Sequence, residues 1–295
     1  SGMRLSTGVN NTIIGRNAGY DMTIASYNTI IGESSGYLMT NATDNVFVGQ
    51  GTGFNTTSGS QCVFIGGGSS SNIGAGYSNT TGINNTYVGF QSGKSSTTSN
   101  DNTAVGYLSG YSNIGADNTN IGSEAGYNQT TGTENTNIGR KAGYGDSGGA
   151  TGNYNTSVGS NTCVSMTSGS FNSVFGRGAG YSLTTGTRNV LIGSSSSIGG
   201  TDSAGYSLSI GSDCVYIGVK AGNNSTSSVN NICIGSNSGG RISTGVDNVL
   251  IGSEAGRRIL TTKDNLFLGR NAGKNYQGSS SIMIGNYAGE KSTSN

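Results

Sequence analysis

The sequence predicts an all-β protein, a parallel β-solenoid of about 16 coils with a 17-residue repeat. The first observation is the recurrence of a pattern typified by residues 28–37, Asn-Thr-Ile-Ile-Gly-Glu-Ser-Ser-Gly-Tyr. The second is that the residue before the first glycine of each copy is always apolar, and mostly β-branched, as strands prefer. This marker glycine occurs at Gly15, Gly32, Gly49, Gly66, Gly89, Gly106, Gly122, Gly139, Gly159, Gly176, Gly193, Gly218, Gly235, Gly252, Gly269 and Gly285. A fixed short period along a whole chain indicates stacked repeats.

Composition narrows the class of protein. Charged residues make up 10%, with a net charge of +1, so the basic stripe that nucleic acid requires is absent. No apolar run approaches the ~20 residues of a membrane-spanning helix, and a strict aliphatic phase is not expected of a disordered chain. We expect one solenoid domain over residues 11–289, a lead-in at 1–10 that includes an expression scar, and a tail at 290–295.

Each copy is expected to read strand, corner, strand, corner. The residue before the marker and the residue two earlier share one strand face, because side chains alternate with a period of two. We take that face as the interior. No segment has the apolar spacing of a helix.

Corners are indicated by small residues, glycine and asparagine. The third residue after the marker is Ala, Ser or Thr, and the fourth is usually glycine, which accepts positive φ. Asparagine precedes most strands and, when stacked, can form an amide ladder. Five aspartates precede this asparagine and are read as turn formers: Asp44, Asp101, Asp117, Asp247 and Asp264. Extra residues around 69–77, 145–152 and 194–213 are expected to form surface loops, with a binding face as the alternative.

The run from Asn118 to Thr136 resembles the 17-residue repeats of phage tail-fibre-like proteins, which often precede a self-cleaving chaperone domain. It is similar, more loosely, to the heads of trimeric autotransporter adhesins, which are left-handed parallel β-rolls assembled as trimers. The tail-fibre resemblance extends from about Asn11 to Gly289. It implies a structural role outside the cell or on a virion.

Catalytic and metal chemistry is not indicated. The chain has no histidine, so nucleophilic machinery that depends on histidine is excluded. Its four cysteines, Cys62, Cys163, Cys214 and Cys233, show no metal-binding spacing and are read as packed residues. Glu33, Glu124, Glu134 and Glu254 are read as solvated carboxylates rather than a glycosidase pair. We therefore expect no enzyme and no cofactor or metal.

An aromatic row follows the second glycine of several copies. It comprises Tyr20, Tyr37, Phe54, Tyr111, Tyr127, Tyr144 and Tyr181. A ladder that seals a corner is the preferred interpretation, and a sugar-binding row is the alternative.

The function expected from the repeat and the resemblance is that of a structural or adhesive fibre segment. It would extend or present a receptor-binding surface, with a host-surface glycan as ligand. The alternative is an ice-binding solenoid, because threonine recurs once per coil in much of the chain. These residues are Thr12, Thr29, Thr86, Thr103, Thr119, Thr136 and Thr156.

A homotrimer is also expected. If the face described above is interior, the middle residue of each strand points outward and forms an apolar strip that needs a cover. The predicted interface residues are Ile13, Ile30, Phe47, Phe64, Tyr87, Val174, Leu191, Tyr216, Leu250, Phe267 and Met283. Closed symmetry makes identical chains the simplest cover, and the number three comes from the resemblance. The alternative is that this row is covered within the chain, by loops or by a wider core.

Overall fold

The computed structural model describes residues 1–68, 73–195 and 201–292. The chain divides into two compact units, an N-terminal unit of residues 1–151 and a C-terminal unit of residues 152–295. Each unit is a parallel β-solenoid of eight coils, and each coil contributes one strand of three residues. No helix occurs among the described residues. The predicted solenoid is therefore confirmed.

Strands are short because a positive-φ residue and a marker glycine bracket each of them. In the N-terminal unit they are β1 (Thr12–Ile14), β2 (Thr29–Ile31), β3 (Val46–Val48), β4 (Val63–Ile65), β5 (Thr86–Val88), β6 (Thr103–Val105), β7 (Thr119–Ile121) and β8 (Thr136–Ile138). In the C-terminal unit they are β9 (Thr156–Val158), β10 (Ser173–Phe175), β11 (Val190–Ile192), β12 (Val215–Ile217), β13 (Ile232–Ile234), β14 (Val249–Ile251), β15 (Leu266–Leu268) and β16 (Ile282–Ile284).

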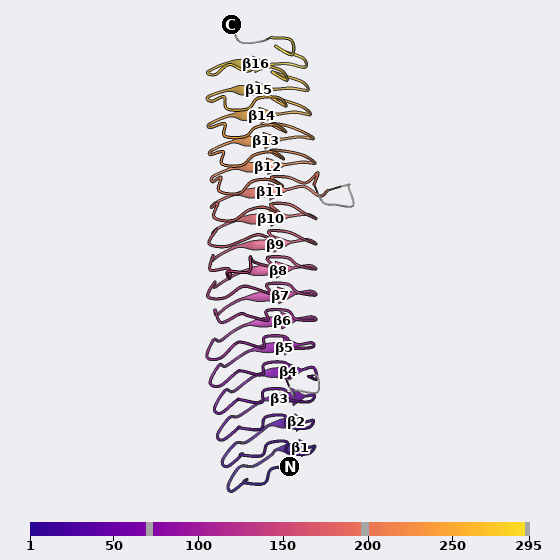
Figure 1. The fold of residues 1–295 in the computed structure, drawn as a ribbon, viewed down its shortest axis with the longest axis vertical. Helices are drawn as coiled ribbons and strands as arrows, with labels where there is room; N and C mark the ends of the chain where they lie inside the picture. Colours follow the sequence, from indigo (N-terminus) through magenta and orange to yellow (C-terminus); the bar gives the residue numbers. More distant parts are fainter. Residues whose placement is uncertain (69–72, 196–200, 293–295) are drawn as a thin grey trace. The chain divides into compact units, whose positions relative to one another are not determined.

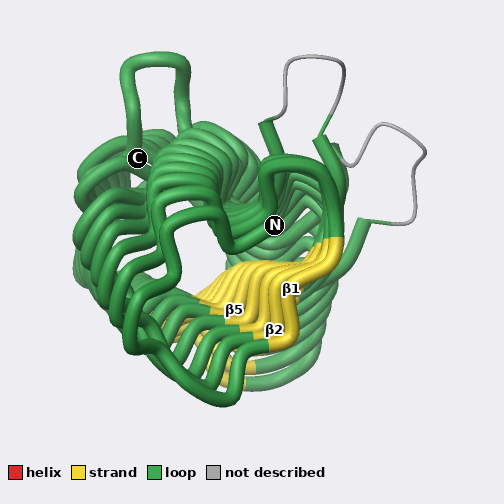
Figure 2. Tube along the Cα trace, turned by 90° about the horizontal axis from the view of Figure 1, so that it is seen from below, coloured by secondary structure: helices red, strands yellow, loops and turns green. Residues whose placement is uncertain are grey.

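Neighbouring coils within a unit pair in parallel and in register. Thr29 lies opposite Val46, Ile30 opposite Phe47 and Ile31 opposite Val48, and the same register recurs along both units. Figure 1 shows the coils of each unit following one another in sequence order, and Figure 2 shows β1, β2 and β5 in a single row. The second strand predicted for each copy is wrong. That segment is formed by turns, with isolated bridges such as Ser26 to Thr43, because its backbone bonds to the next coil without extended geometry.

The interior face is the opposite of the one predicted from the sequence. The middle residue of the strand is buried, as in Phe64, whereas its neighbour Ile65 is 38% exposed. The asparagine before most strands explains this phase, because its buried amide points inward and side chains alternate from it. Asn45, one residue before β3, and Phe47, the middle of β3, thus share the interior face.

A second interior column lies nine residues after the middle of each strand that no insertion follows, across the core from it. Large residues in one column meet small residues in the other: Tyr87 donates to Ser96 Oγ at 2.8 Å, and Tyr216 Oη lies 3.0 Å from Ser225 Oγ. Conversely, the small Cys233 is followed nine residues later by Ile242, and both are buried. This volume compensation keeps the core filled from coil to coil.

Asparagines form the predicted amide ladder inside the corner. Asn45 donates to Asn28 Oδ1 from its backbone nitrogen at 3.1 Å and from Nδ2 at 3.0 Å. Its Nδ2 also donates to the carbonyl of Gly59 at 3.0 Å. The ladder satisfies buried backbone groups that the short strands leave unpaired.

Left-handed backbone marks the corners, as predicted. The five aspartates read as turn formers all have positive φ, for example 59° at Asp44. The marker Gly32 has φ 137°, and a Cβ built on it would lie 2.4 Å from the carbonyl oxygen of Gly49. Only glycine permits this approach between coils.

The structure describes the expected lead-in and one of the three expected loops in full, and parts of the other two loops and of the expected tail. Residues 1–10 bond to the first coil, since Ser6 and Thr7 both donate to the Thr23 carbonyl. The loop at 145–152 rejoins its coil where Ala150 donates to the Asn128 carbonyl at 2.8 Å. The inserted residues 69–72 and 196–200 lie outside the described residues, as do 293–295 of the predicted tail.

Candidate functional surfaces

The outward strand face of the C-terminal unit forms an apolar surface column. It consists of the first and third residues of β9–β16. Only Thr156 and Ser173 among them are polar, and the rest are aliphatic or phenylalanine. Phe175, Ile192 and Ile251 are each exposed by 38–39%. Regular backbone pairing keeps this face flat, because every strand has the same register.

In the N-terminal unit the corresponding face is mixed. Threonine is the first residue of six of its eight strands: Thr12, Thr29, Thr86, Thr103, Thr119 and Thr136. The third residue is always isoleucine or valine. Threonine thus points outward beside an aliphatic residue, whereas the sequence interpretation placed both inside.

The predicted trimer interface does not lie on a surface. Ile30, Phe47, Tyr87, Leu191 and Phe267 are fully buried in the core. The same holds for Phe64, Val174, Tyr216 and Leu250, and only Ile13 and Met283, in the outermost coils, are partly buried. This correction follows from the inverted faces. The apolar surface that a partner would cover is formed instead by the first and third residues of each strand, which flank each predicted interface residue.

Charged columns of opposite sign flank the outward strand face. The acidic edge is the column two residues before each strand, and its charged members are Asp44, Asp101, Asp117, Glu134, Asp213, Asp247 and Asp264, with Arg188 as the one cation. The basic edge is the column two residues after each strand, and its charged members are Arg16, Arg140, Arg177 and Arg270, with Glu33 as the one anion. The two exceptions are neutralised within their own column, because Arg188 pairs with Asp213 at 2.6 Å and Glu33 pairs with Arg16.

The ion pair between Arg188 and Asp213 shifts the pKa of both groups. The hydrogen bond from Arg188 lowers the pKa of Asp213, and the same bond raises the pKa of Arg188. Arg188 is exposed and Asp213 is partly exposed, so the pair contributes little to stability.

Aromatic side chains form ladders, as preferred from the sequence. Tyr20, Tyr37 and Phe54 stack at 4.9 Å between successive ring centroids, nearly parallel. Tyr111, Tyr127 and Tyr144 form a second ladder at 4.9 and 5.2 Å. Each inner ring has both faces covered by its neighbours, so only ring edges remain for a sugar, which stacks on faces.

The sequence row missed two ladder members. Tyr77 stacks on Phe54 at 5.4 Å, and Tyr206 stacks on Tyr181 at 5.2 Å. Each follows an insertion that breaks the 17-residue count, although each is preceded by glycine. Cations cap ladder ends, with Lys94 Nζ 4.5 Å from the centre of the Tyr111 ring. Burial, followed by the neighbouring phenols, raises the pKa of Tyr127.

The cysteines are buried and unpaired. Burial raises the pKa of the Cys62 thiol to about 11 and that of Cys163 to about 12. Cys62 and Cys214 take the ladder position of asparagine, and their backbone nitrogens still donate to Asn45 Oδ1 and Asn189 Oδ1. Such thiols have no nucleophilic character at neutral pH.

Carboxylates do not gather into a reaction centre among the described residues. Glu33 pairs with Arg16, Glu124 with Lys141 at 3.3 Å, and Glu254 with Lys274 at 2.5 Å. Glu134 lies at an exposed positive-φ turn. Within residues 1–68, 73–195 and 201–292, no group of three His, Cys, Asp or Glu side chains could hold a metal ion.

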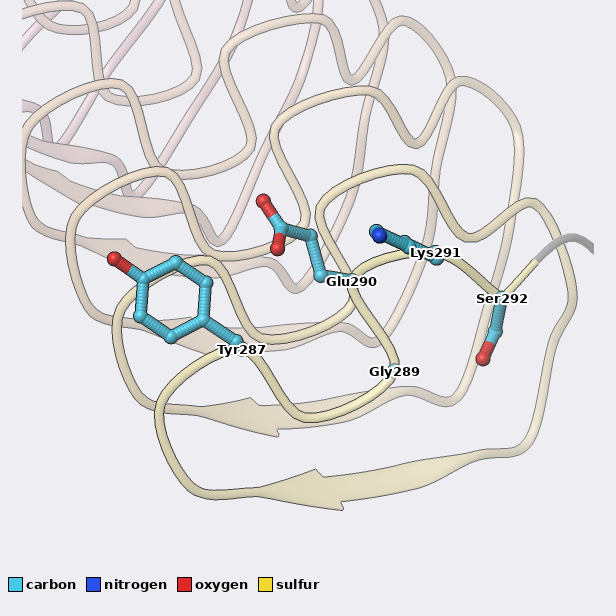
Figure 3. A pocket seen from close by; sticks show the side chains of 5 residues that line it. All are labelled: Tyr287, Gly289, Glu290, Lys291 and Ser292. Carbon is cyan, nitrogen blue, oxygen red and sulfur yellow. The ribbon is translucent and has the colours of Figure 1, made fainter.

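A shallow hollow of about 460 Å³ lies at the last turn. It is lined by Tyr287, Gly289, Glu290, Lys291 and Ser292. Figure 3 shows these side chains spread along one turn of the outermost coil. It contains no paired nucleophile and base, so it has no catalytic arrangement.

No family model, no curated protein and no solved structure matches the chain. Among the residues described, no helix has the length and apolarity needed to cross a membrane.

Proposed function

We propose that the chain is a structural segment of a fibre on a virion or cell exterior, and that it associates with copies of itself through its outward strand face. The supporting observation is that no first or third residue of the sixteen strands carries a charge. A regular, uncharged and largely aliphatic column facing water favours association. The role is non-enzymatic and adhesive, with a host-surface glycan as the ligand class. The resemblance to tail-fibre repeats supports this role and a trimer.

The strand face needs its flanks to make a stable interface. Strands of three residues in eight stacked coils give a flat face of roughly 10 by 40 Å for one unit, or about 400 Å². A stable interface buries about 800 Å² on each partner. The acidic and basic edges on either side therefore belong to the proposed contact.

These edges favour a parallel orientation of the copies. Asp264, on the acidic edge, and Arg270, on the basic edge, belong to the same coil. In the described part of the chain these two side chains form no ion pair with each other. When two copies lie parallel, a symmetry axis along the coil stack brings Asp264 of one copy beside Arg270 of the next. An antiparallel pair would place acidic edges against each other, which costs stability.

Light scattering and disulfide trapping test this assembly. We expect a single closed oligomer. Val190→Cys and Ile282→Cys, in the third and the last strand of the C-terminal unit, should each form disulfide-linked chains alone, because parallel copies place identical coils together. Asn224→Cys, in an exposed turn outside the strand face, is the control and should stay unlinked. A monomer, or trapping only when both cysteines are mixed, would contradict the proposal.

A charge exchange provides a second test at one coil. Asp264→Lys should weaken the oligomer, because it places a lysine side chain beside Arg270 of the neighbouring copy. Asp264→Lys combined with Arg270→Asp should restore it. If the double variant is as weak as the single one, these two columns do not meet.

Ice binding is the second candidate, and the N-terminal unit favours it. Its outward threonines repeat at ~4.8 Å between coils and lie ~6.8 Å from the aliphatic residue of the same strand. A flat grid of hydroxyls and methyls can order water. Thermal hysteresis at micromolar protein, lost in Thr103→Asp/Thr119→Asp, would support this function. Unchanged ice growth would exclude it.

A further inference from the structure

A cluster of cations projects from the corner of three consecutive coils in the C-terminal unit. It comprises Arg241, Arg257, Arg258 and Lys274; Glu254 pairs with two of them, and Glu290 occupies the position equivalent to Lys274 in the next coil. Six of the 15 lysines and arginines of the chain lie within residues 241–274, and four of them form this cluster. The cluster is unusual in a protein of which 10% of the residues are charged.

Backbone hydrogen bonds show that these cations stand in register. Arg241 donates to the Arg257 carbonyl at 3.0 Å, and Arg258 donates to the Lys274 carbonyl at 2.9 Å. The same bond links Ser182 to Tyr206 in an earlier coil, at 3.0 Å. Arg257 and Lys274 therefore occupy the column that holds the aromatic ladder elsewhere, and Arg241 and Arg258 occupy the column beside it.

Charge compensation within the cluster is incomplete. Glu254 accepts from Lys274 at 2.5 Å and lies 3.3 Å from Arg257, and the Lys274 contact contributes most to lowering the pKa of Glu254. Arg241 and Arg258 form no ion pair with any residue in the described part of the chain, and both are exposed. By contrast, Arg188 pairs with Asp213 on the next coil.

Unpaired arginines on neighbouring coils repel each other, as like charges do across paired strands. The coils are ~4.8 Å apart, within the ~8 Å Debye length of physiological salt, so the four cations act together. A sequence feature that opposes the fold in this way points to a ligand. The guanidinium fork fits sulfate, phosphate or carboxylate oxygens.

We infer that this basic cluster binds an anionic polysaccharide that carries sulfate or other acidic groups at regular intervals. The cluster lies on exposed turns rather than in a cavity, so it suits an extended chain laid across several coils. The aromatic column that could stack on nucleic acid bases is replaced here by Arg257 and Lys274, which disfavours single-stranded nucleic acid. The inference rests on the proposed adhesive role, and it names the ligand class and the residues.

The test uses dextran sulfate and neutral dextran as probes on the whole chain. Wild-type protein should bind dextran sulfate, with an affinity that falls as the salt concentration rises, and should not bind neutral dextran. Arg241→Gln/Arg258→Gln should bind at least about tenfold more weakly, because two charge-assisted contacts are lost. Its melting temperature should be unchanged or higher, since repulsion is removed.

Arg4→Gln/Lys94→Gln, which lies outside the strand face and both charged edges, is the charge-matched control, and it should change binding less than about twofold if position rather than net charge matters. Equal loss in both variants, or no binding by wild type, would overturn the inference. So would tighter binding of a single-stranded oligonucleotide through the same arginines. Repeating the measurement on Asp264→Lys separates the two proposals, because that variant tests assembly and leaves the basic cluster intact.

Discussion

Asn45 donates two hydrogen bonds to the same side-chain oxygen of Asn28, one from its backbone nitrogen at 3.1 Å and one from Nδ2 at 3.0 Å. The relationship is repeated by Asn172 on Asn155 and by Asn248 on Asn231. Each of these asparagines is thus both donor and acceptor, and the ladder ties a coil to the one before it wherever both carry the asparagine.

Replacing one asparagine by aspartate should therefore be costly. Asn45→Asp keeps the shape but removes the Nδ2 donor to Asn28 and Gly59, and it buries a carboxylate. We expect a loss of about 3 kcal/mol in the free energy of unfolding, measured by urea denaturation. Asn224→Asp, in an exposed turn, is the matched control and should change stability by less than about 0.5 kcal/mol. Similar losses in both variants would show that the ladder is not responsible.

The inverted strand faces can be tested with two adjacent residues. Phe64 is fully buried and Ile65 is 38% exposed. Phe64→Ala should cost about 3 to 5 kcal/mol, as large core truncations do. Ile65→Ala should cost less than about 1 kcal/mol in urea denaturation at a protein concentration where the chain is monomeric. A larger loss of stability for Ile65→Ala than for Phe64→Ala would mean that the interior face predicted from the sequence is correct.

The sequence predicted the coil number, the register of the repeat, the asparagine ladder and the left-handed corners, because each depends on a residue type at a fixed position. It did not predict which strand face is interior. Uniform aliphatic residues such as Ile31 and Ile251 suggested a core, yet the true core position varies from Ala104 to Tyr216. The volume difference is compensated by the residue across the core, which is Asn113 opposite the small Ala104 and Ser225 opposite the large Tyr216. Inspecting one position of the repeat by itself cannot reveal such a compensating partner.

The surfaces were harder to predict than the fold. Tyr77 and Tyr206 were missed because insertions shift the count, although the glycine before each gave a signal. The two charged edges were visible only in part, since the aspartates were recognised as turn formers without regard to the arginines on the other side of the strand. To recognise that the acidic and basic edges flank the same surface, one must know which strand face points outward.

Marker glycines should not tolerate a side chain. Gly252 has φ 134°, and a Cβ there would lie 2.5 Å from the Gly269 carbonyl oxygen. Gly252→Ala should therefore separate two coils and cost at least about 2 kcal/mol in urea denaturation. Gly148→Ala, where a Cβ would meet nothing within 4 Å, should be neutral. If Gly252→Ala were neutral as well, the close approach of the coils would be wrong.

Alkaline pH should destabilise the fold through its buried thiols. Burial raises the pKa of Cys62 from 9.0 to about 11, so the folded state holds its proton longer than the unfolded state does. The stability linked to this group is complete below pH 9 and is lost as pH rises from 9 to 11, by about 2 to 3 kcal/mol. Cys62→Asn removes the thiol and supplies the missing ladder amide. This variant should be more stable at pH 8, and its melting temperature should fall less between pH 8 and pH 10.5. A wild-type melting temperature that is constant over this range would contradict the linkage.

The buried amide side chains of the N-terminal core, Asn120, Gln129 and Asn137, should be replaceable by apolar residues only when all three are replaced together. Asn137 Nδ2 donates to Asn120 Oδ1 at 2.9 Å and to Gln129 Oε1 at 3.2 Å, while Asn120 Nδ2 is buried with no hydrogen-bond partner. Elsewhere these two core columns hold residues such as Leu191 and Met39.

We expect Gln129→Met alone to cost about 1 to 3 kcal/mol, because it leaves a donor of Asn137 without this acceptor. Asn120→Leu/Gln129→Met/Asn137→Leu removes the whole network and leaves Asn118 Oδ1 bonded to the Asn135 backbone nitrogen at 3.0 Å. The triple variant should match or exceed the wild-type free energy of unfolding, since burying unsatisfied amides is unfavourable and leucine fills a similar volume. Urea denaturation of both variants measures the difference. A triple variant less stable than Gln129→Met would mean that the network stabilises the core and that the unpaired Asn120 amide has a partner in solution, such as a buried water.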